Sequence, residues 1–273
     1  DDIELRDRYL QDVSKLPEKN QLSRHLLLAE SALSRRDYTV VEQEIQAASR
    51  INPGLTRLVR LKLRYAFDHG DALEVLNMTA KLLKAGAINE YEANEYRLWA
   101  YRRLIALASD QSSFKACLKR IPEDLRIGQL CVVIADKYEH LGLYPQAVAW
   151  VSKYYPLTQQ TELLPVFVQS VGYLGEKEQR KAIDTAEVWL QKRPEDAHLL
   201  NYLGLLSYSN KLWGKAQGYL EASLAVEPSM QARLGLAKVF DETDQTKKAE
   251  EQRKLALANI EQEEELNLPV VQP

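Results

Sequence analysis

The chain has 273 residues, 45% of them hydrophobic and 27% charged, a balance that is typical of a folded protein and excludes a disordered one. Its net charge of −3 provides no basic field, so nucleic acid is not the expected partner. With only 11 Gly and 10 Pro, the composition favours helices over a fold of strands and turns.

Repeats of 33 or 34 residues run along the chain. Val41 and Val75 are 34 residues apart, and Ala182, Ala216 and Ala249 follow one another at intervals of 34 and 33 residues. The same interval separates two prolines at repeat ends: Pro194 and Pro228. Such a period indicates pairs of antiparallel helices, which stack because one pair cannot bury its apolar face alone. We predict an all-α, tetratricopeptide-type α-α superhelix of about fifteen helices.

Small residues recur where the two helices of a pair are expected to approach each other. On the first helix of successive pairs they are Ala29, Ala135, Gly204 and Ala237. On the second helix they are Ala147, Ala182, Ala216 and Ala249. Because protein interiors are close-packed, only small side chains fit between backbones at such short range. Proline after the second helix then ends it, since proline cannot continue a helix.

Two stretches depart from the repeat. In residues 86–124 we expect a long helix over 91–108 and a shorter one over 113–120. In residues 156–177 we expect a weak first helix that is kinked or broken at Pro165. We therefore divide the chain into N-terminal repeats (1–155), an irregular central joint (156–177), C-terminal repeats (178–260) and a mobile acidic tail (261–273).

Repeat arrays of this kind usually bind their ligands on the concave face, which the outward side of each first helix lines. Arg57, Arg60, Arg64 and Phe67 recur three or four residues apart, so one helix presents them together. Their guanidinium groups would capture an acidic peptide segment or an anionic headgroup, and without acidic neighbours they repel one another unless a ligand offsets the charge. The alternative is a solvated face. Later first helices add further candidates for partner binding: Gln129, Asp136, Glu139, His140, His198, Asn201 and Tyr208.

Catalytic, metal and cofactor motifs are missing from the sequence. It contains no GxGxxG or GxxxxGK[ST] loop, no HExxH zinc motif and no GxSxG nucleophile motif. The four histidines are scattered, and Cys117 and Cys131 form neither a zinc motif nor a haem-attachment motif. We expect both cysteines to be small buried hydrophobes. The chain is therefore predicted not to be an enzyme, and to hold no metal and no cofactor.

Membrane association is expected to come from outside this sequence. The longest apolar runs are far shorter than the roughly 20 residues of a membrane span. Because the chain opens with Asp1 and Asp2 and no Met, we expect a membrane anchor to precede it.

Several blocks of this sequence resemble the HemY family of bacterial inner-membrane proteins. They are residues 96–100 (YRLWA), 133–138 (VIADKY), and 182–194 leading into 200–206 (LNYLGLL), and the last repeat, 232–258, ends as in that family. The resemblance covers nearly the whole chain in the order of its elements. It implies two N-terminal membrane spans followed by a repeat domain that faces the cytoplasm. It also implies an organising role in late protohaem biosynthesis, with haem-biosynthetic enzymes or envelope proteins as partners.

Three functional hypotheses follow. The first is a membrane-tethered scaffold that gathers haem-biosynthetic or related envelope proteins. The second is a porphyrin or haem carrier, with His140 or His198 as axial ligand. The third is an envelope assembly adaptor with no link to haem. The first is preferred, because no residue cluster indicates a haem site.

Overall fold

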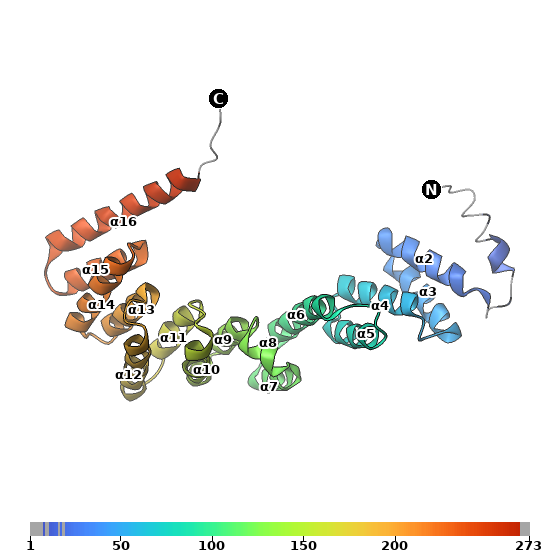
Figure 1. Cartoon of the computed structure of the whole chain (residues 1–273), viewed down its shortest axis with the longest axis horizontal. Coiled ribbons are helices and arrows are strands. Elements are labelled where there is room, and N and C mark those ends of the chain that lie inside the picture. Colours follow the sequence, from blue (N-terminus) through green and yellow to red (C-terminus); the bar gives the residue numbers. More distant parts are fainter. Residues whose placement is uncertain (1–7, 9–10, 16, 18–19, 268–273) are drawn as a thin grey trace, which may run out of the picture. The chain divides into compact units, whose positions relative to one another are not determined.

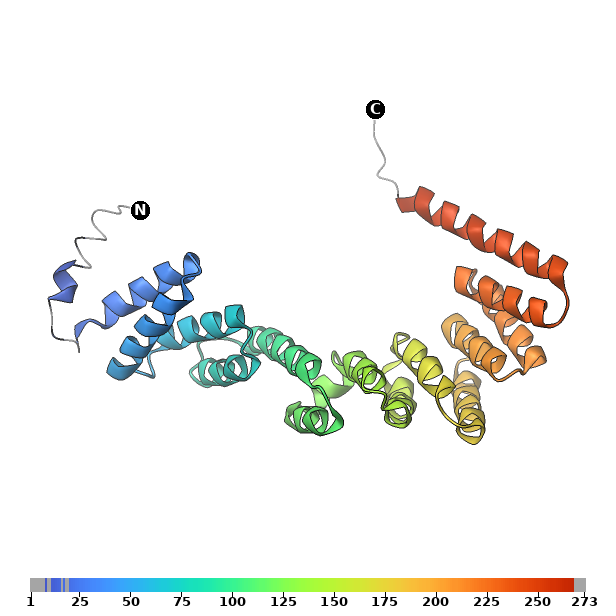
Figure 2. The same cartoon turned by 180° about the vertical axis from the view of Figure 1, so that it is seen from behind.

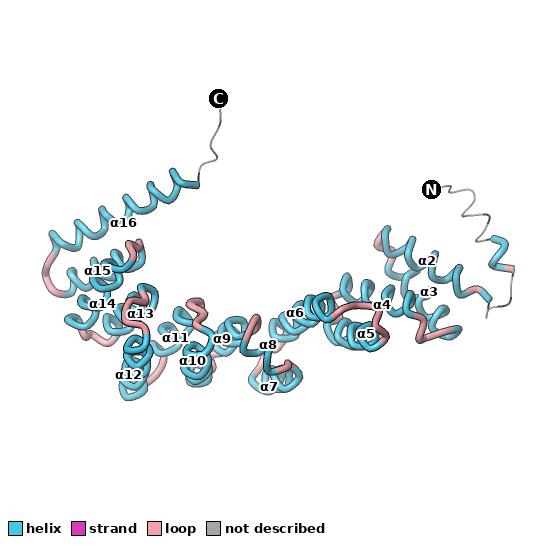
Figure 3. Tube along the Cα trace, in the orientation of Figure 1, coloured by secondary structure: helices cyan, strands magenta, loops and turns pink. Residues whose placement is uncertain are grey.

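The computed structural model describes residues 8, 11–15, 17 and 20–267, with the backbone alone for 259–267. All regular structure in this part of the chain is helical, and it contains no strand (Figures 1 and 3). The prediction of an all-α, tetratricopeptide-type fold is confirmed. The predicted acidic tail begins as part of the last helix, and its final residues, 268–273, lie outside the described residues.

The chain divides into two compact units, residues 1–121 and residues 122–273. The first unit contains α2 (Leu22–Ser34), α3 (Tyr38–Ile51), α4 (Thr56–His69), α5 (Ala72–Lys84), α6 (Glu90–Leu107) and α7 (Gln111–Arg120). The second contains α8 (Glu123–Ile127), α9 (Cys131–His140), α10 (Tyr144–Thr158), α11 (Leu163–Gly172), α12 (Glu176–Lys192), α13 (Ala197–Ser209), α14 (Trp213–Val226), α15 (Met230–Glu242) and α16 (Thr246–Asn267). Within each unit successive helices form hairpins, which Figure 2 shows from behind.

The turn inside five of these hairpins contains one residue in the left-handed conformation. Gly70 and Gly142 have φ values of 77° and 67°, and Arg36, Lys211 and Asp244 adopt the same conformation with φ of 59°, 57° and 58°. A left-handed residue ends the preceding helix because it turns the chain away from the helix axis. In all five hairpins the second helix begins two residues later, so the turn is repeated with the period of the sequence.

Capping side chains fix where several helices begin. Asp71 accepts a hydrogen bond from the backbone N–H of Glu74 at 3.0 Å, and Asp196 accepts one from Leu199 at 2.9 Å. Each bond satisfies an N–H group that has no partner within the helix. Asp37, Asn89, Asp110 and Ser229 make the equivalent bond at the starts of α3, α6, α7 and α15.

The small residues predicted at the helix contacts are all buried: Ala29, Ala135, Ala147, Ala182, Gly204, Ala216, Ala237 and Ala249. Around them each unit has its own apolar core. In the first unit, one cluster joins α2, α3 and α4, and a second joins α4, α5 and α6. In the second unit, one cluster runs from α9 to α13, and another joins α14, α15 and α16.

The predicted break at Pro165 is wrong. Helix α11 begins at Leu163, so Pro165 lies in the first turn. The N–H that proline lacks has no helical partner at that place, so proline is tolerated there. The chain leaves the helical path earlier instead, at Gln159, which caps α10 with a φ of 55°.

Residues 156–177, which we treated as an irregular joint, belong to the core of the second unit. Leu163, Leu164 and Phe167 of α11 are buried in the same cluster as Val151 of α10. The division between the two compact units falls earlier, between residues 121 and 122. An irregular repeat in the sequence is therefore packed as tightly here as its neighbours.

Candidate partner-binding faces of the first helices

Helix α4 presents the predicted arginine stripe on one side. Arg57, Arg60, Arg64 and Phe67 are all exposed, while the intervening apolar residues of the helix are buried. This arrangement follows from the helical period, which places residues three or four apart on the same face. We call these four residues, together with the rings that contact Phe67, the arginine-aromatic face.

Two of the three arginines are bound to their own unit. Arg57 donates from Nε and Nη2 to the two carboxylate oxygens of Glu30 on α2, at 2.8 and 2.7 Å, and this hydrogen bonding raises the pKa of Arg57. Arg60 donates from Nη2 to the carbonyl oxygen of Ala87. The expectation that the stripe lacks an acidic neighbour is therefore wrong for Arg57, because Glu30 comes from another first helix, 27 residues earlier in the chain.

Arg64 and Phe67 form the open part of the face. Arg64 is exposed and makes no ion pair with any described residue. The Phe67 side chain is 37% exposed, and its ring lies 4.3 Å from the Trp99 ring and 6.0 Å from the Tyr96 ring, measured between centroids. A free guanidinium beside a supported aromatic ring suits a ligand that carries both a carboxylate and an apolar group.

On α9 the predicted polar residues gather around two carboxylates. Burial raises the pKa of Asp136, and burial and the charge of Asp136 raise the pKa of Glu139. The Nδ1 atom of His140 lies 3.1 Å from the carbonyl oxygen of Asp136, so its N–H donates there. Gln129 is exposed in the turn before α9, outside this contact. Half-buried carboxylates without a basic partner among the described residues favour a cationic ligand.

On α13 the three predicted residues have different environments. His198 is exposed, whereas Asn201 is only 4% exposed. Tyr208 is half-buried with its ring 5.4 Å from that of Trp213, and burial together with Glu242 and Asp241 raises its pKa. Sequence spacing identified the face but not the burial of Asn201, which depends on contact with α15.

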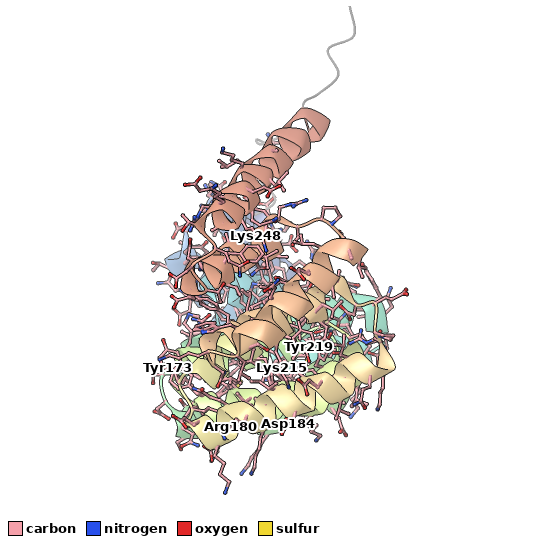
Figure 4. The ribbon with its side chains drawn as sticks, turned by 90° about the vertical axis from the view of Figure 1, so that its left-hand side faces the viewer. Tyr173, Arg180, Asp184, Lys215, Tyr219 and Lys248 are labelled. Atoms are coloured by element: carbon pink, nitrogen blue, oxygen red, sulfur yellow. The ribbon has the colours of Figure 1, made fainter. Side chains whose placement is uncertain are left out.

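The largest cavity among those described lies elsewhere, between the second helices α12 and α14. It has a volume of about 560 Å³, and Arg180, Asp184 and Lys215 line it (Figure 4). The ammonium of Lys215 lies 2.7 Å from the carboxylate of Glu187, which also accepts a hydrogen bond from Tyr219 at 2.7 Å. Sequence reasoning missed this groove because it treated charged residues on second helices as solvated. Its walls carry both signs of charge, so it selects no single ligand charge.

Metal and cofactor chemistry finds little support in the described part of the chain. No group of three or more His, Cys, Asp or Glu side chains gathers there. Cys117 and Cys131 are both buried, as predicted, and burial raises the pKa of each thiol. No histidine lines the four cavities that the structure describes. Among the described helices, none combines the length and the apolar character that a membrane span requires.

Comparison with known proteins gives similarity to repeat proteins. No protein-family model and no curated protein matches the sequence. MamA from Desulfovibrio magneticus is 18% identical over 69% of this chain and 94% of its own, with a TM-score of 0.40. TTC0263, a TPR protein of Thermus thermophilus, is 15% identical over 87% of this chain and 90% of its own (TM-score 0.29). The TPR domain of P58(IPK) is 16% identical over 83% and 67% (TM-score 0.34). At these values the likeness does not extend to ligands or partners.

Proposed function

We propose that this chain is a non-catalytic scaffold that holds acidic segments of partner proteins on the arginine-aromatic face of its first unit. The observation that carries the proposal is the pairing of an unbound guanidinium, Arg64, with the exposed ring of Phe67 one turn later. Aromatic and arginine side chains are the residues that most often dominate protein interfaces. The first unit has 20 Lys and Arg against 17 Asp and Glu, a net charge of +3, which suits an acidic partner.

A finer proposal concerns the cell. The resemblance to the HemY family supports a repeat domain tethered to the bacterial inner membrane, facing the cytoplasm and organising late protohaem biosynthesis. Under this proposal the acidic segments belong to haem-biosynthetic enzymes or to envelope proteins. The scaffold hypothesis does not depend on it, because the arginine-aromatic face would bind an acidic segment in any compartment.

The scaffold proposal is tested by charge reversal in the membrane-anchored protein. Proteins captured by the wild type are compared with those captured by an Arg60→Glu/Arg64→Glu variant. Arg50→Glu/Lys81→Glu serves as the matched control, because it reverses the same number of exposed charges on the second helices α3 and α5. We expect the first variant to lose the captured proteins and the control to keep them. Equal capture by all three proteins would show that the stripe is a solvated face.

The haem part is tested separately, in a strain that lacks the gene. Porphyrin intermediates that precede protohaem should accumulate there, and the wild-type gene should restore their level. Normal porphyrin and protohaem contents would refute the haem role and leave the scaffold intact as an envelope adaptor. A haemin titration of the purified chain separates the carrier hypothesis, since a stoichiometric Soret band that is lost in His140→Ala or His198→Ala would favour it.

A further inference from the structure

An unsatisfied buried amide lies on the first-helix face of the second unit. The Nδ2 group of Asn201 on α13 donates to Oε1 of Gln231 on α15 at 2.9 Å, while its Oδ1 atom is buried and has no hydrogen-bond partner in the described structure. Exchanging the nitrogen and oxygen of both amides leaves one Asn201 atom unpaired in either case. A buried polar atom of this kind destabilises the fold, whereas an apolar side chain of similar size would not. Its presence indicates a role other than stability.

The surroundings of Asn201 form a seam between the first helices α13 and α15. Leu205, one turn further along α13, packs so close to α15 that a β-carbon on Gly235 would lie 3.1 Å from Leu205 Cδ2. Beside the seam, Met230 and Leu234 of α15 are 41% and 40% exposed. The seam therefore offers a polar group at one end and apolar surface along its length.

The other end of the seam is acidic. Tyr208 follows Asn201 by two turns, and the charges of Glu242 and Asp241 act on its hydroxyl. Arg253 pairs with Asp241, but Glu242 is exposed and makes no ion pair with any described residue. The second unit as a whole has 16 Lys and Arg against 22 Asp and Glu, a net charge of −6.

We propose that this seam binds an extended, basic segment of a partner protein, whose main chain pairs with the Asn201 carboxamide and whose Lys or Arg reaches Glu242. A carboxamide carries both a donor and an acceptor, the complement of a peptide C=O and N–H. Gln231 is exposed, so its side chain can move aside and release the Asn201 amide to the ligand. The Cα atoms of Asn201 and Tyr208 are seven residues apart on one helix, about 10.5 Å, which about three residues of extended chain would span.

This inference adds a second binding site to the proposed scaffold, of opposite charge preference and in the other unit. An acidic segment suits the first unit but would be repelled by Glu242. The two sites can therefore fail independently. Arg60→Glu/Arg64→Glu should abolish capture of acidic partners and leave binding of basic segments to the seam unchanged.

The test uses a display library of random twelve-residue peptides selected on the purified wild-type chain. We expect selection of peptides rich in Lys or Arg, and their affinity is then measured by fluorescence polarisation against three variants. Asn201→Leu should weaken binding about tenfold or more, because the carboxamide pairing is lost while the fold is kept. Glu242→Gln should weaken it about threefold or more and reduce its dependence on salt. Glu250→Gln, which removes an exposed charge from α16, should change neither quantity.

Folding and main-chain recognition are controlled in the same experiment. Asn201→Leu should melt at or above the wild-type temperature, so that lost binding cannot be ascribed to unfolding. Methylating the peptide nitrogens one at a time should identify one position that weakens binding to the wild type but not to Asn201→Leu. The inference would be overturned by a library without basic enrichment, by equal affinity for wild type and either seam variant, or by peptides that tolerate methylation at every nitrogen.

Discussion

Gly204 on α13 lies so close to Leu220 on α14 that a β-carbon at Gly204 would be 2.5 Å from Leu220 Cγ and 2.8 Å from Leu220 Cδ2. The backbone nitrogen of Leu220 would be only 3.3 Å away, and the Leu220 side chain is fully buried. Neither neighbour can move without disturbing the core. The absence of a side chain at Gly204 is therefore what lets this hairpin close.

Gly204→Ala should destabilise the second unit. Alanine gains up to about 1 kcal/mol in helix propensity, but overpacking a closed contact costs about 1–3 kcal/mol, so the packing penalty should exceed the gain. Gly218→Ala on α14 is the matched control, because a β-carbon there meets nothing within 4 Å. The control should raise the melting temperature measured by circular dichroism, and Gly204→Ala should lower it. A stabilised Gly204→Ala would contradict the close approach.

Enlarging the alanines that separate the paired helices should have a similar effect. Ala147 and Ala216 are fully buried in the second unit, so replacing either with Leu should cost about 1–3 kcal/mol of unfolding free energy. Ala149→Leu, at an exposed position of α10, supplies the comparison. Urea unfolding measures all three. If the buried variants unfold at the midpoint of the exposed one, the repeat register is wrong.

Much of the fold could be predicted because the repeat is a local property. The 33- to 34-residue period places small residues such as Ala147 and Ala216 at helix contacts, and every predicted contact residue is buried. The error at Pro165 arose because the effect of a proline depends on its distance from the helix start. That start is set by the left-handed Gln159 and by the packing of α11, which sequence period does not show.

The candidate sites were less predictable, because their chemistry depends on contacts between repeats. Helical spacing identified which side chains share a face. It could not show that Arg57 is bound by Glu30 or that Asn201 is buried against Gln231, since those partners come from neighbouring repeats. Partners separated by 27 and 30 residues become visible only when the repeats are stacked.

The half-buried Asp136 should make stability depend on pH. Burial raises the pKa of Asp136, so the folded chain binds this proton at a pH where the unfolded chain has released it. The carboxylate therefore destabilises the fold above its raised pKa, and stability recovers as the pH falls through that value towards the ordinary carboxyl pKa. His140 opposes the effect without reversing it.

Asp136→Asn removes this titration. It should melt at a higher temperature than the wild type at pH 7, and the difference should shrink by pH 4, where the wild-type carboxyl is increasingly protonated. Asp184→Asn, at an exposed carboxylate on α12, should show no such change. Melting curves at both pH values decide the matter, and a difference that grows on acidification would contradict the direction of the shift.

The bond between Arg57 and Glu30 leads to a prediction about binding on the first unit. Because Glu30 holds Arg57 through both carboxylate oxygens, Arg57 should stabilise the α2–α4 contact and contribute little to ligand capture. Arg57→Ala should cost at most about 1 kcal/mol, since the pair is exposed to solvent, and should leave ligand affinity nearly unchanged. Arg64→Ala should do the reverse, with stability within about 0.5 kcal/mol of the wild type and weaker binding.

Glu30→Gln provides the sharper test, because it should increase binding. Removing the carboxylate releases the Arg57 guanidinium next to Arg60 and Arg64, and the added positive charge should attract an acidic ligand more strongly. The probe is a fluorescein-labelled peptide with a tryptophan between pairs of glutamates, titrated at low and high salt. We expect its affinity to rise for Glu30→Gln, to fall for Arg64→Ala and for Phe67→Ala, and to differ least at high salt for the charge variants. Unchanged affinity across Glu30→Gln and Arg64→Ala would mean that the arginine-aromatic face binds no acidic segment.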